Sequence, residues 1–449
     1  MSLLELKDLF HSREAVLGVV GLGYVGLPLA CVFADAGFKC IAVDIQQERV
    51  DNINAGRSPI EGEEPGLDEL LSKVLRSGGL HAATNYSALS NADVIFIAVE
   101  TPVNDQHLPD YTALTSVCRM LGPVLKAGAL VIVESTLSPG TTDNQVRQEL
   151  ETASMKQCGV DFFLGTCPER VMPGKLLANL RTMNRVCGGT TPETADAMVE
   201  LYATVVDADL DPSDALTAEL VKTTENAYRD VQIAFANEIA LICEATGGDV
   251  WRVRDLVNKS PFRSMHLPGA GVGGHCIPKD PWLLASSVQS KDVPLHVIPV
   301  ARAVNDRMPN HMLELLQSAL QEAGRSLRGA HILILGYAYL EDSDDVRNSP
   351  SAVFIEHLQS AGATAVVHDP YITEYSGNIF TKAQDTDAVV IFVRHKHYLD
   401  LDLVRLKRVL QSPILIDGRN IIDPADAMAS GFIFRSLGRV IHKGIRYSQ

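Results

Sequence analysis

The stretch "AVLGVVGLGYVGLPLACVFADAGFKCIAVD", residues 15–44, decides the fold of the first part of this chain. Its apolar run Val16–Val20 is typical of a buried strand. Three glycines follow in a GxGxxG pattern: Gly21, Gly23 and Gly26. A helix is expected from there to the glycine at position 37, and "CIAVD" forms a second strand that ends at Asp44. The order strand, glycine turn, helix and strand predicts one unit of a parallel, doubly wound α/β sheet.

The glycine turn indicates dinucleotide binding of the Rossmann type. The first glycine allows a tight turn, the second lets the backbone approach a pyrophosphate, and the third lets helix and strand pack closely. Asp44, which follows Gly26 by 18 residues, is placed to accept hydrogen bonds from the ribose hydroxyls, and its charge disfavours a 2′-phosphate. We therefore expect NAD, held by the turn and the second strand: Gly21, Gly23, Tyr24, Val25, Gly26 and Asp44.

The same stretch has an alternative interpretation as a membrane segment. Residues 16–34 are 19 residues without a charge, which is long enough to span a bilayer. Four of them are glycines and Pro28 lies among them, so a strand, a turn and a helix explain the pattern better. We expect no membrane partner.

Composition and charge limit the classes of function. A chain of 449 residues is long enough for two or three domains, and a formal charge of −16 argues against general nucleic-acid binding. The eight cysteines are scattered without a CxxC pair, and no signal peptide is recognisable. We expect free thiols in a reducing cytoplasm and no metal site.

Two further apolar runs, 92–102 and 129–142, continue the predicted parallel sheet. Each ends in small or polar residues, where open α/β sheets bind their ligands. Thr101 and Thr136 are therefore candidate cofactor contacts, and the alternative is that they form a strand-end turn or cap a helix.

A long helix is predicted over residues 217–248, ended by two glycines. At 100° per residue, four polar side chains fall within about 80° of one another: Lys222, Asn226, Arg229 and Asn237. Apolar residues flank this stripe on both sides, which suits the half-buried wall of a ligand site. A solvated helix face is the alternative.

The segment "GAGVGGHCIPKDPW", residues 269–282, places a cysteine at the end of a glycine loop. Its glycines free backbone N–H groups to approach a ligand, and Asp280 is expected to cap a helix that begins with a proline. A helix start, Lys279 and His275 are reasons for a lowered pKa of the Cys276 thiol, and hence for reactivity. A buried structural cysteine is the alternative.

A second α/β domain is predicted near the carboxyl end of the chain. Apolar strands recur there from "AHILILGYAY" onward, without a GxGxxG motif. Arg347 and Arg419 lie in loops near strand ends, where guanidinium groups can pair with a diphosphate.

Seven motifs, in order, resemble the nucleotide-sugar dehydrogenases of the UDP-glucose/GDP-mannose dehydrogenase family. They are "GLGYVGLPLA", "ESTLSPGTT", "CPERVMPGK", "ELVKTTENAYRDVQIAFANEIA", "GVGGHCIPKDPW", "DSDDVRNSP" and "DGRN". The resemblance implies two Rossmann-like domains joined by a central helical region with a long helix. It implies an NAD-binding domain at 1–205, a catalytic and dimerising domain at 206–312, and a UDP-sugar-binding domain at 313–449.

The resemblance also implies a reaction. Members oxidise the C6 alcohol of a UDP-sugar twice, through a thiohemiacetal and a thioester on the cysteine, here Cys276. The implied catalytic residues are Glu169, Lys222, Asn226, Cys276 and Asp280. Further implied cofactor contacts are Arg49, Thr101, Thr136 and Arg347. Implied substrate contacts are Glu169, Arg170, Lys222, Asn226, Arg229, Asn237, Gly273, Arg419 and Arg263, the last reaching the sugar of its own or the neighbouring subunit.

Within the family, "CPERVMPG" and "ENAYRDV" resemble the N-acetylhexosamine branch. UDP-N-acetylmannosamine is the leading expectation, followed by its epimers and UDP-glucose. Two positions depart from the usual pattern, because Leu340 replaces a substrate-binding lysine and Glu100 replaces a proline. A homodimer through the central helix is expected.

Two other classes of function remain open at this point. A two-electron dehydrogenase of the 3-hydroxyacid type shares the glycine turn and a helical lysine but does not need Cys276. A non-catalytic NAD-binding protein keeps the turn and Asp44 but loses the set Lys222, Cys276 and Asp280, which this chain retains.

Overall fold

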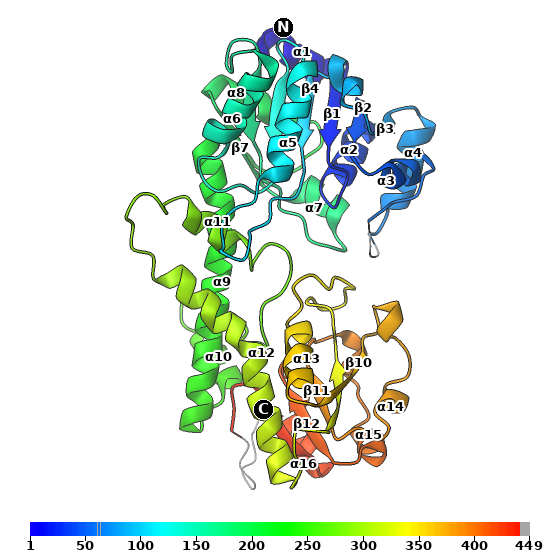
Figure 1. Ribbon diagram of the computed structural model, residues 1–449, viewed down its shortest axis with the longest axis vertical. Coiled ribbons are helices and arrows are strands. Elements are labelled where there is room, and N and C mark those ends of the chain that lie inside the picture. Colours follow the sequence, from blue (N-terminus) through cyan, green and yellow to red (C-terminus); the bar gives the residue numbers. More distant parts are fainter. Residues whose placement is uncertain (61, 63, 441–449) are drawn as a thin grey trace. The chain divides into compact units, whose positions relative to one another are not determined.

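The computed structural model describes residues 1–60, 62 and 64–440. Contacts divide the chain into two compact units. Unit 1 comprises residues 1–225 and 279–293, and unit 2 comprises residues 226–278 and 294 onward. Each unit contains one mainly parallel sheet with helices packed against it (Figure 1). The predicted α/β class is confirmed.

Unit 1 is built on an eight-stranded sheet with the order β3-β2-β1-β4-β5-β6-β7-β8. Only the β6–β7 pair is antiparallel. The strands are β1 (Val16–Val20), β2 (Lys39–Val43), β3 (Leu80–Ala83), β4 (Val94–Ile97), β5 (Leu130–Val133), β6 (Phe163–Thr166), β7 (Arg185–Gly189) and β8 (Leu210–Asp214). The helices are α1 (Leu3–Ser12), α2 (Gly26–Asp35), α3 (Gln47–Asn54), α4 (Leu67–Arg76), α5 (Thr112–Leu121), α6 (Arg147–Ser154), α7 (Leu176–Thr182), α8 (Pro192–Tyr202) and α11 (Asp280–Ser286). Strand order reverses between β1 and β4, which is where open α/β sheets bind ligands.

Two hydrophobic clusters cover the two faces of this sheet. Leu17 and Val19 of β1 pack with α1, α2 and α8, whereas Ile95 and Ile97 of β4 pack with α5 and α6. All residues of α2 except Asp35 are buried. The uncharged run 16–34 is therefore apolar because a buried strand and a buried helix follow each other. Among the described residues, no helix is long and apolar enough to cross a membrane.

Unit 2 contains a parallel five-stranded sheet with the order β10-β9-β11-β12-β13. Its strands are β9 (His331–Leu335), β10 (Thr364–His368), β11 (Ala388–Ile391), β12 (Ile414–Asp417) and β13 (Ile433–Ser436). Alternate residues of β9 face opposite clusters, so Ile332 packs with α12 (Val297–Glu322) and α13 (Pro350–Ser360). Leu333 faces α14 (Ile379–Lys382), α15 (Leu403–Val409) and α16 (Pro424–Ala429). α10 (Val250–Val257) completes the helices of this unit.

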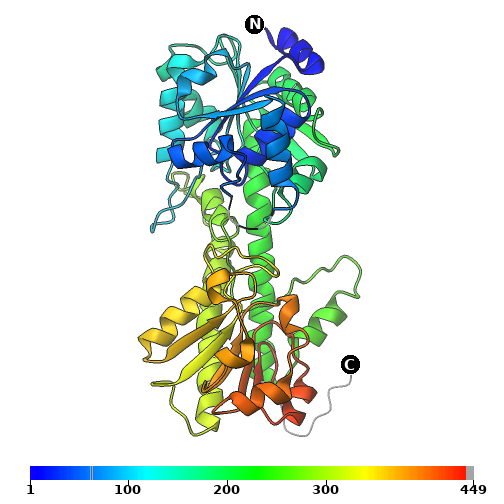
Figure 2. The same ribbon diagram turned by 90° about the vertical axis from the view of Figure 1, so that its right-hand side faces the viewer.

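The predicted long helix is α9 (Ala215–Thr246), 32 residues in one unbroken run, green in Figure 2. Its first eleven residues belong to unit 1 and the remainder to unit 2. Gly247 adopts φ +84°, and the N–H of Gly248 bonds to the carbonyl of Cys243 at 2.8 Å. A left-handed glycine therefore ends the helix just before the predicted end.

Candidate functional site

The glycine turn after β1 has the geometry that a pyrophosphate requires. Gly21 adopts φ +90°, which only glycine tolerates without strain. A Cβ at Gly26 would collide with the carbonyl oxygen of Gly21, so the backbones of the turn and of α2 are in direct contact. Gly23, by contrast, has nothing within 4 Å of the position that a Cβ would take. The open space lies in front of the middle glycine, so the residues present fit a dinucleotide.

Asp44 closes this turn from the neighbouring strand. Its Oδ2 accepts the N–H of Leu22 at 2.9 Å and pairs with Arg49 at 3.0 Å. Its Oδ1 accepts the N–H of Gln46 at 3.0 Å. The structure thus brings together Gly21, which follows β1, Asp44, which follows β2, and Arg49 of α3.

The carboxyl ends of β4 and β5 meet through two threonines. The hydroxyl of Thr101 donates to the carbonyl of Thr136 at 2.7 Å. The Lys279 ammonium donates to the carbonyl of Thr101 at 3.0 Å and lies 3.3 Å from the carboxylate of Asp280. Lys279 thus fastens the start of α11 to the sheet, a role that its position in the sequence did not reveal.

Asp280 is fully buried at the first residue of α11. The sequence predicted it as the residue that caps this helix, but Lys279 occupies the N-cap position and makes no side-chain cap bond. The difference arises because Pro281, which needs no N–H partner in the first turn, sits one position further in. The Asp280 carboxylate is buried, with its Oδ1 3.3 Å from the Lys279 ammonium.

Glu169 and Lys222, from separate motifs, come together in unit 1. Both are buried, with 7% and 9% of their surface exposed. Burial raises the pKa of the Glu169 carboxyl, while Arg185 and the Lys222 ammonium act in the opposite direction. The carboxylate Oε2 also accepts the N–H of Val171 at 2.5 Å. A raised carboxyl pKa brings the group closer to the pH range in which general acid–base catalysis is efficient.

Arg170, the neighbour of Glu169, is held by a residue that the sequence analysis missed. Its guanidinium binds both carboxylate oxygens of Glu225, at 3.0 and 2.5 Å, and donates to the carbonyl of Asn184. Glu225 lies on α9, one turn after Lys222. This bidentate pair fixes the loop after β6 against the helix.

The four polar residues predicted to form a stripe on α9 have different environments. Lys222 is buried, Asn226 is half-buried and Arg229 is exposed. Asn237 is completely buried, and its amide binds Asn305 and Gly269. The stripe is therefore neither one solvated face nor one continuous ligand wall.

The glycine loop that carries Cys276 is packed inside unit 2. Gly273 and Gly274 press against Tyr339, where Cβ atoms would lie 2.5 and 2.7 Å from its side chain. The N–H of Gly274 bonds to the carbonyl of Arg347 at 2.8 Å, and the amide of Asn348 donates to the carbonyl of Gly274 at 3.0 Å. The glycines thus permit a close approach to the loop after β9, and the N–H of Gly274 is used within the chain.

Two arginines predicted to meet a diphosphate lie in unit 2. Arg347 makes a bidentate pair with the buried Asp345, with its Nη2 2.6 Å from Oδ2. Arg419 donates through Nε to the carbonyl of Phe392 at 2.6 Å, and its guanidinium packs against Gly269. Leu340, which replaces the usual lysine, has 37% of its surface exposed.

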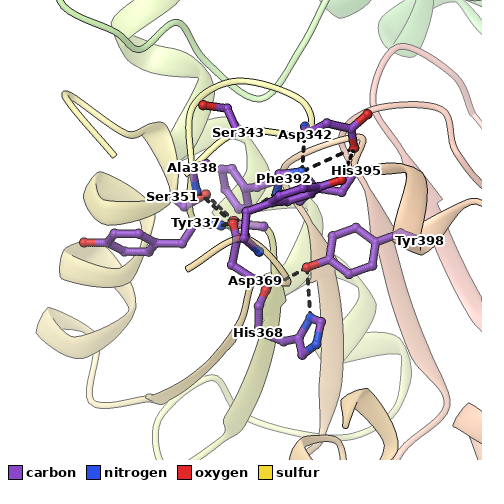
Figure 3. A network of polar contacts seen from close by, with 12 residues as sticks. Tyr337, Ala338, Asp342, Ser343, Ser351, His368, Asp369, Phe392, His395 and Tyr398 are labelled. Carbon is purple, nitrogen blue, oxygen red and sulfur yellow. Dashed lines mark hydrogen bonds and ion pairs between the residues drawn. The ribbon is translucent and has the colours of Figure 1, made fainter. Parts of the chain in front are cut away.

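The loop after β9 is held by a buried polar network that the sequence analysis did not single out. Figure 3 shows Asp369, at the end of β10, receiving the backbone N–H groups of Tyr337 and Ala338 at 2.7 and 3.0 Å. His395 bridges Asp369 and the N–H of Asp342, at 3.1 and 2.9 Å. Because Nδ1 of His395 accepts from a backbone N–H, its Nε2 carries the proton that is shared with Asp369.

Comparison with known protein families accounts for most of the chain. Three models match in order: the NAD binding domain of the UDP-glucose/GDP-mannose dehydrogenase family over residues 15–206, its central domain over 216–307 and its UDP binding domain over 333–424. The chain belongs to this family. It is an NAD-dependent nucleotide-sugar dehydrogenase, and the UDP binding domain points to a UDP-sugar as substrate.

Individual members of the family are similar over nearly their whole length. A UDP-N-acetyl-D-mannosamine dehydrogenase of Pyrococcus horikoshii is 38% identical over 423 residues, which are 94% of this chain and 99% of that protein. The solved structure of that dehydrogenase superposes with a TM-score of 0.88. An NDP-N-acetyl-D-galactosaminuronic acid dehydrogenase of Methanosarcina mazei is 38% identical, with a TM-score of 0.85 and coverage of 98% of both chains.

For this dehydrogenase, Asp44→Ala is expected to weaken NAD binding. The substitution removes the acceptor of the Leu22 N–H, and with it the carboxylate that is predicted to accept from the ribose hydroxyls, so we expect the KM for NAD to rise by about 10²-fold. The preference for NAD over NADP should fall, because the carboxylate no longer repels a 2′-phosphate. Initial rates with both cofactors measure this, with Asp51→Ala of the exposed face of α3 as control. An unchanged KM for NAD contradicts the assignment of Asp44.

Proposed function

We propose that this dehydrogenase oxidises the C6 alcohol of a UDP-N-acetylhexosamine to the carboxylate, with transfer of four electrons and Cys276 as nucleophile. The observation that carries the proposal is the contrast among the eight cysteines, all of which lie in described parts of the chain. Seven are buried and Cys276 is exposed. A thiol at the surface of a glycine loop can reach a substrate, whereas the other seven are core residues.

The proposed chemistry has two oxidations and one hydrolysis. The alcohol first loses a hydride and a proton to become an aldehyde. The Cys276 thiolate then adds to the aldehyde carbon, and loss of a second hydride from the thiohemiacetal gives a thioester. Water cleaves the thioester, so the thiolate leaves and a carboxylate forms. A hydroxyl group is a poorer nucleophile than a thiolate and a poorer leaving group.

NAD, when bound, supplies the acceptor for each hydride. The residues that would hold it are the glycine turn with Asp44 and Arg49, and the strand ends with Thr101 and Thr136. We also propose Tyr24, Val25 and Arg347 as contacts. All of these except Arg347 belong to unit 1, whose Gly23 leaves the space that a pyrophosphate needs.

The proton steps are proposed for the buried polar residues of unit 1. The Lys222 ammonium stabilises negative charge that develops on the C6 oxygen, and Glu169 moves a proton during hydrolysis. Asp280 helps to orient the water, and Asn226 of unit 2 is proposed as a further catalytic residue. The raised pKa of Glu169 supports its assignment, because a carboxyl group with an ordinary pKa is a weak general acid or base at neutral pH.

Substrate choice rests on similarity and on the motif around Glu169. Several relatives are named UDP-N-acetyl-D-mannosamine dehydrogenases, among them one of Campylobacter jejuni that is 36% identical over 402 residues, covering 85% of this chain. We propose UDP-N-acetylmannosamine, with its epimers next. The proposed sugar and diphosphate contacts are Arg170, Arg229, Arg263, Gly273 and Arg419. The bounds 1–205, 206–312 and 313–449 are proposed as the three functional domains.

The test is the number of NADH molecules formed for each UDP-N-acetylmannosamine consumed, with excess NAD and a reaction run to completion. Two NADH and a uronate product support the proposal. One NADH and an aldehyde product indicate a two-electron dehydrogenase and exclude the thioester route. No NADH with this sugar, but two with another UDP-sugar, corrects the substrate and directs attention to Leu340.

We further propose that the protein forms a homodimer through α9. We also propose that it works in a reducing cytoplasm, where its cysteines stay in the thiol form. Large apolar side chains are exposed along this helix: Leu216, Leu220, Tyr228, Phe235 and Ile242. At 100° per residue they fall within about 120° of one another, so they form one apolar face. Exposed apolar faces of this kind are typical of subunit interfaces.

Phe235→Glu is expected to convert the dimer to a monomer. Phe235 has 55% of its surface exposed and lies inside the apolar face of α9. A twofold interface buries the substitution twice, so we expect dimerisation to weaken on the order of 10³-fold. Light scattering during gel filtration measures the mass. Leu4→Glu, an exposed apolar residue on α1, is the control, and a dimer that survives Phe235→Glu contradicts the proposed interface.

A further inference from the structure

Two buried asparagines of unit 2 connect α9 and α12 to the glycine loop that carries Cys276. Asn237 lies on α9 and Asn305 on α12, and neither side chain is exposed at all. The Nδ2 of Asn237 donates to Oδ1 of Asn305 at 2.9 Å. The Oδ1 of Asn237 accepts the N–H of Gly269, the first residue of the glycine loop, at 2.8 Å.

Asp230 determines which way both amides point. The Nδ2 of Asn305 lies 3.0 Å from the backbone carbonyl oxygen of Asp230 and 2.8 Å from the carboxylate Oδ1 of Asp230. A carbonyl oxygen and a carboxylate oxygen can only accept hydrogen bonds. The carboxylate is held by Arg302, whose Nη1 lies 2.6 Å from Oδ1. Asn305 must therefore present its oxygen to Asn237. Asn237 must in turn present its oxygen to Gly269, because the reverse orientation would face donor with donor.

This chain of hydrogen bonds ends at a loop with little freedom. At Gly269 there is no room for a Cβ beside the guanidinium of Arg419. Gly271 adopts φ +135°, and a Cβ there would lie 2.8 Å from Pro350 and 3.2 Å from Pro309. Further along, the N–H of Gly274 donates a hydrogen bond to the carbonyl of Arg347, and its carbonyl accepts one from the amide of Asn348. A displacement at Gly269 therefore shifts the segment that leads to Cys276 instead of being absorbed by a flexible loop.

We propose that Asn237 and Asn305 are positioning residues, which fix the Cys276 loop through the N–H of Gly269 instead of touching the sugar. The inference rests on the proposed role of Cys276, but the hydrogen-bond chain can be tested separately. Both polar atoms of the Asn237 amide have partners inside the protein and the side chain is completely buried, so a sugar contact would require the packing around it to open. Asn305 is the more specific probe, because in the described part of the chain its side chain hydrogen-bonds to Asn237 and Asp230 and not to the loop.

The first measurement is hydrogen exchange of the amide of Gly269 in Asn305→Leu, Asn237→Leu and the double variant. Asn237→Leu removes the acceptor of the Gly269 amide, and Asn305→Leu removes the group that orients this acceptor. We therefore expect exchange of the Gly269 amide to be about tenfold faster in each single variant. The double variant should exchange no faster than Asn237→Leu, because Asn305 acts through Asn237. Asn305→Ala is made in parallel, since it removes the amide without adding bulk to the buried contact.

The matched control is Asp306→Asn. Asp306 binds the same arginine, Arg302, but its side chain is 62% exposed and contacts neither amide. It should leave exchange at Gly269 unchanged. If exchange at Gly269 is unchanged in Asn305→Leu and in Asn305→Ala, or if Asp306→Asn raises it equally, the proposal is overturned.

The second measurement is the ratio of NADH formed to UDP-N-acetylmannosamine consumed, with the free aldehyde trapped by hydroxylamine. A displaced Cys276 slows capture of the aldehyde but not its formation, so the ratio should fall from two toward one in both asparagine variants. A partly unfolded preparation lowers the rate of both oxidations but keeps the ratio at two. A contact between Asn237 and the sugar would raise the KM in Asn237→Leu and leave Asn305→Leu like wild type, which overturns the proposal. If the wild-type enzyme itself forms no uronate, the proposed function fails, and exchange at Gly269 still decides whether the asparagines fix the loop.

Discussion

Cys276→Ser is expected to stop the reaction before the uronate. The serine hydroxyl cannot capture the aldehyde and leave again as a thiolate does, so we expect uronate formation to fall at least about 10³-fold. NADH formed per sugar should fall from two to one or less. Product analysis by mass spectrometry together with NADH absorbance measures both quantities.

Cys158→Ser is the appropriate control for this substitution. Cys158 is 7% exposed, and its thiol lies 3.8 Å from the hydroxyl of Thr190, so a serine can keep that contact. It should retain two NADH per sugar. Undiminished uronate production by Cys276→Ser would show that another group carries the second oxidation.

Lys222→Ala is expected to lower kcat by about 10²- to 10⁴-fold, because it removes the buried ammonium that we propose as the group that stabilises charge at the C6 oxygen. The substitution should also move the pH dependence. Burial raises the pKa of Glu169 and the Lys222 ammonium opposes this, so removal of the ammonium raises that pKa further. The rate limb that requires ionised Glu169 should therefore shift to higher pH. Profiles of kcat against pH for both proteins measure the shift.

Lys39→Ala is the control, because Lys39 is an exposed lysine of the same unit at the start of β2. It should match wild type in kcat and in pH profile. A Lys222→Ala protein with an unaltered pH profile contradicts the electrostatic link between Lys222 and Glu169, whatever its kcat.

The sequence pattern predicted Asp44 but not its counterpart in unit 2. Asp369 also ends a strand, and it also binds the backbone of the loop after the neighbouring strand, where Gly336 has φ +93°. The signal was present in "AHILILGYAY" followed by "TAVVHD". The glycine motif does not reveal Asp369, because the loop after β9 has one glycine where the turn after β1 has three. The acceptor role of Asp369 follows from the strand-end position and not from the glycine motif.

Contacts between residues that are far apart in the sequence could not be predicted from local sequence patterns. Lys279 and Thr101 are 178 residues apart, and no local periodicity relates them. The pairing of Arg170 with Glu225, 55 residues further along the chain, could not be predicted from either motif. Leu340 and Glu100 could be recognised as departures from a family, and the structure gives no physical reason for either exchange.

The sequence by itself determined the features that depend on neighbours along the chain. Glycine spacing determined the turn at Gly21, apolar runs and periodicity determined β1, β2, β4, β5, β9 and α9, and strand-end position pointed to Asp44. Only the tertiary structure decided how buried polar groups find partners, because those contacts join segments that lie far apart along the chain. Asn237 shows the difference. Its place on a polar stripe suggested a ligand contact, whereas its complete burial between Asn305 and Gly269 assigns both of its polar atoms to the protein.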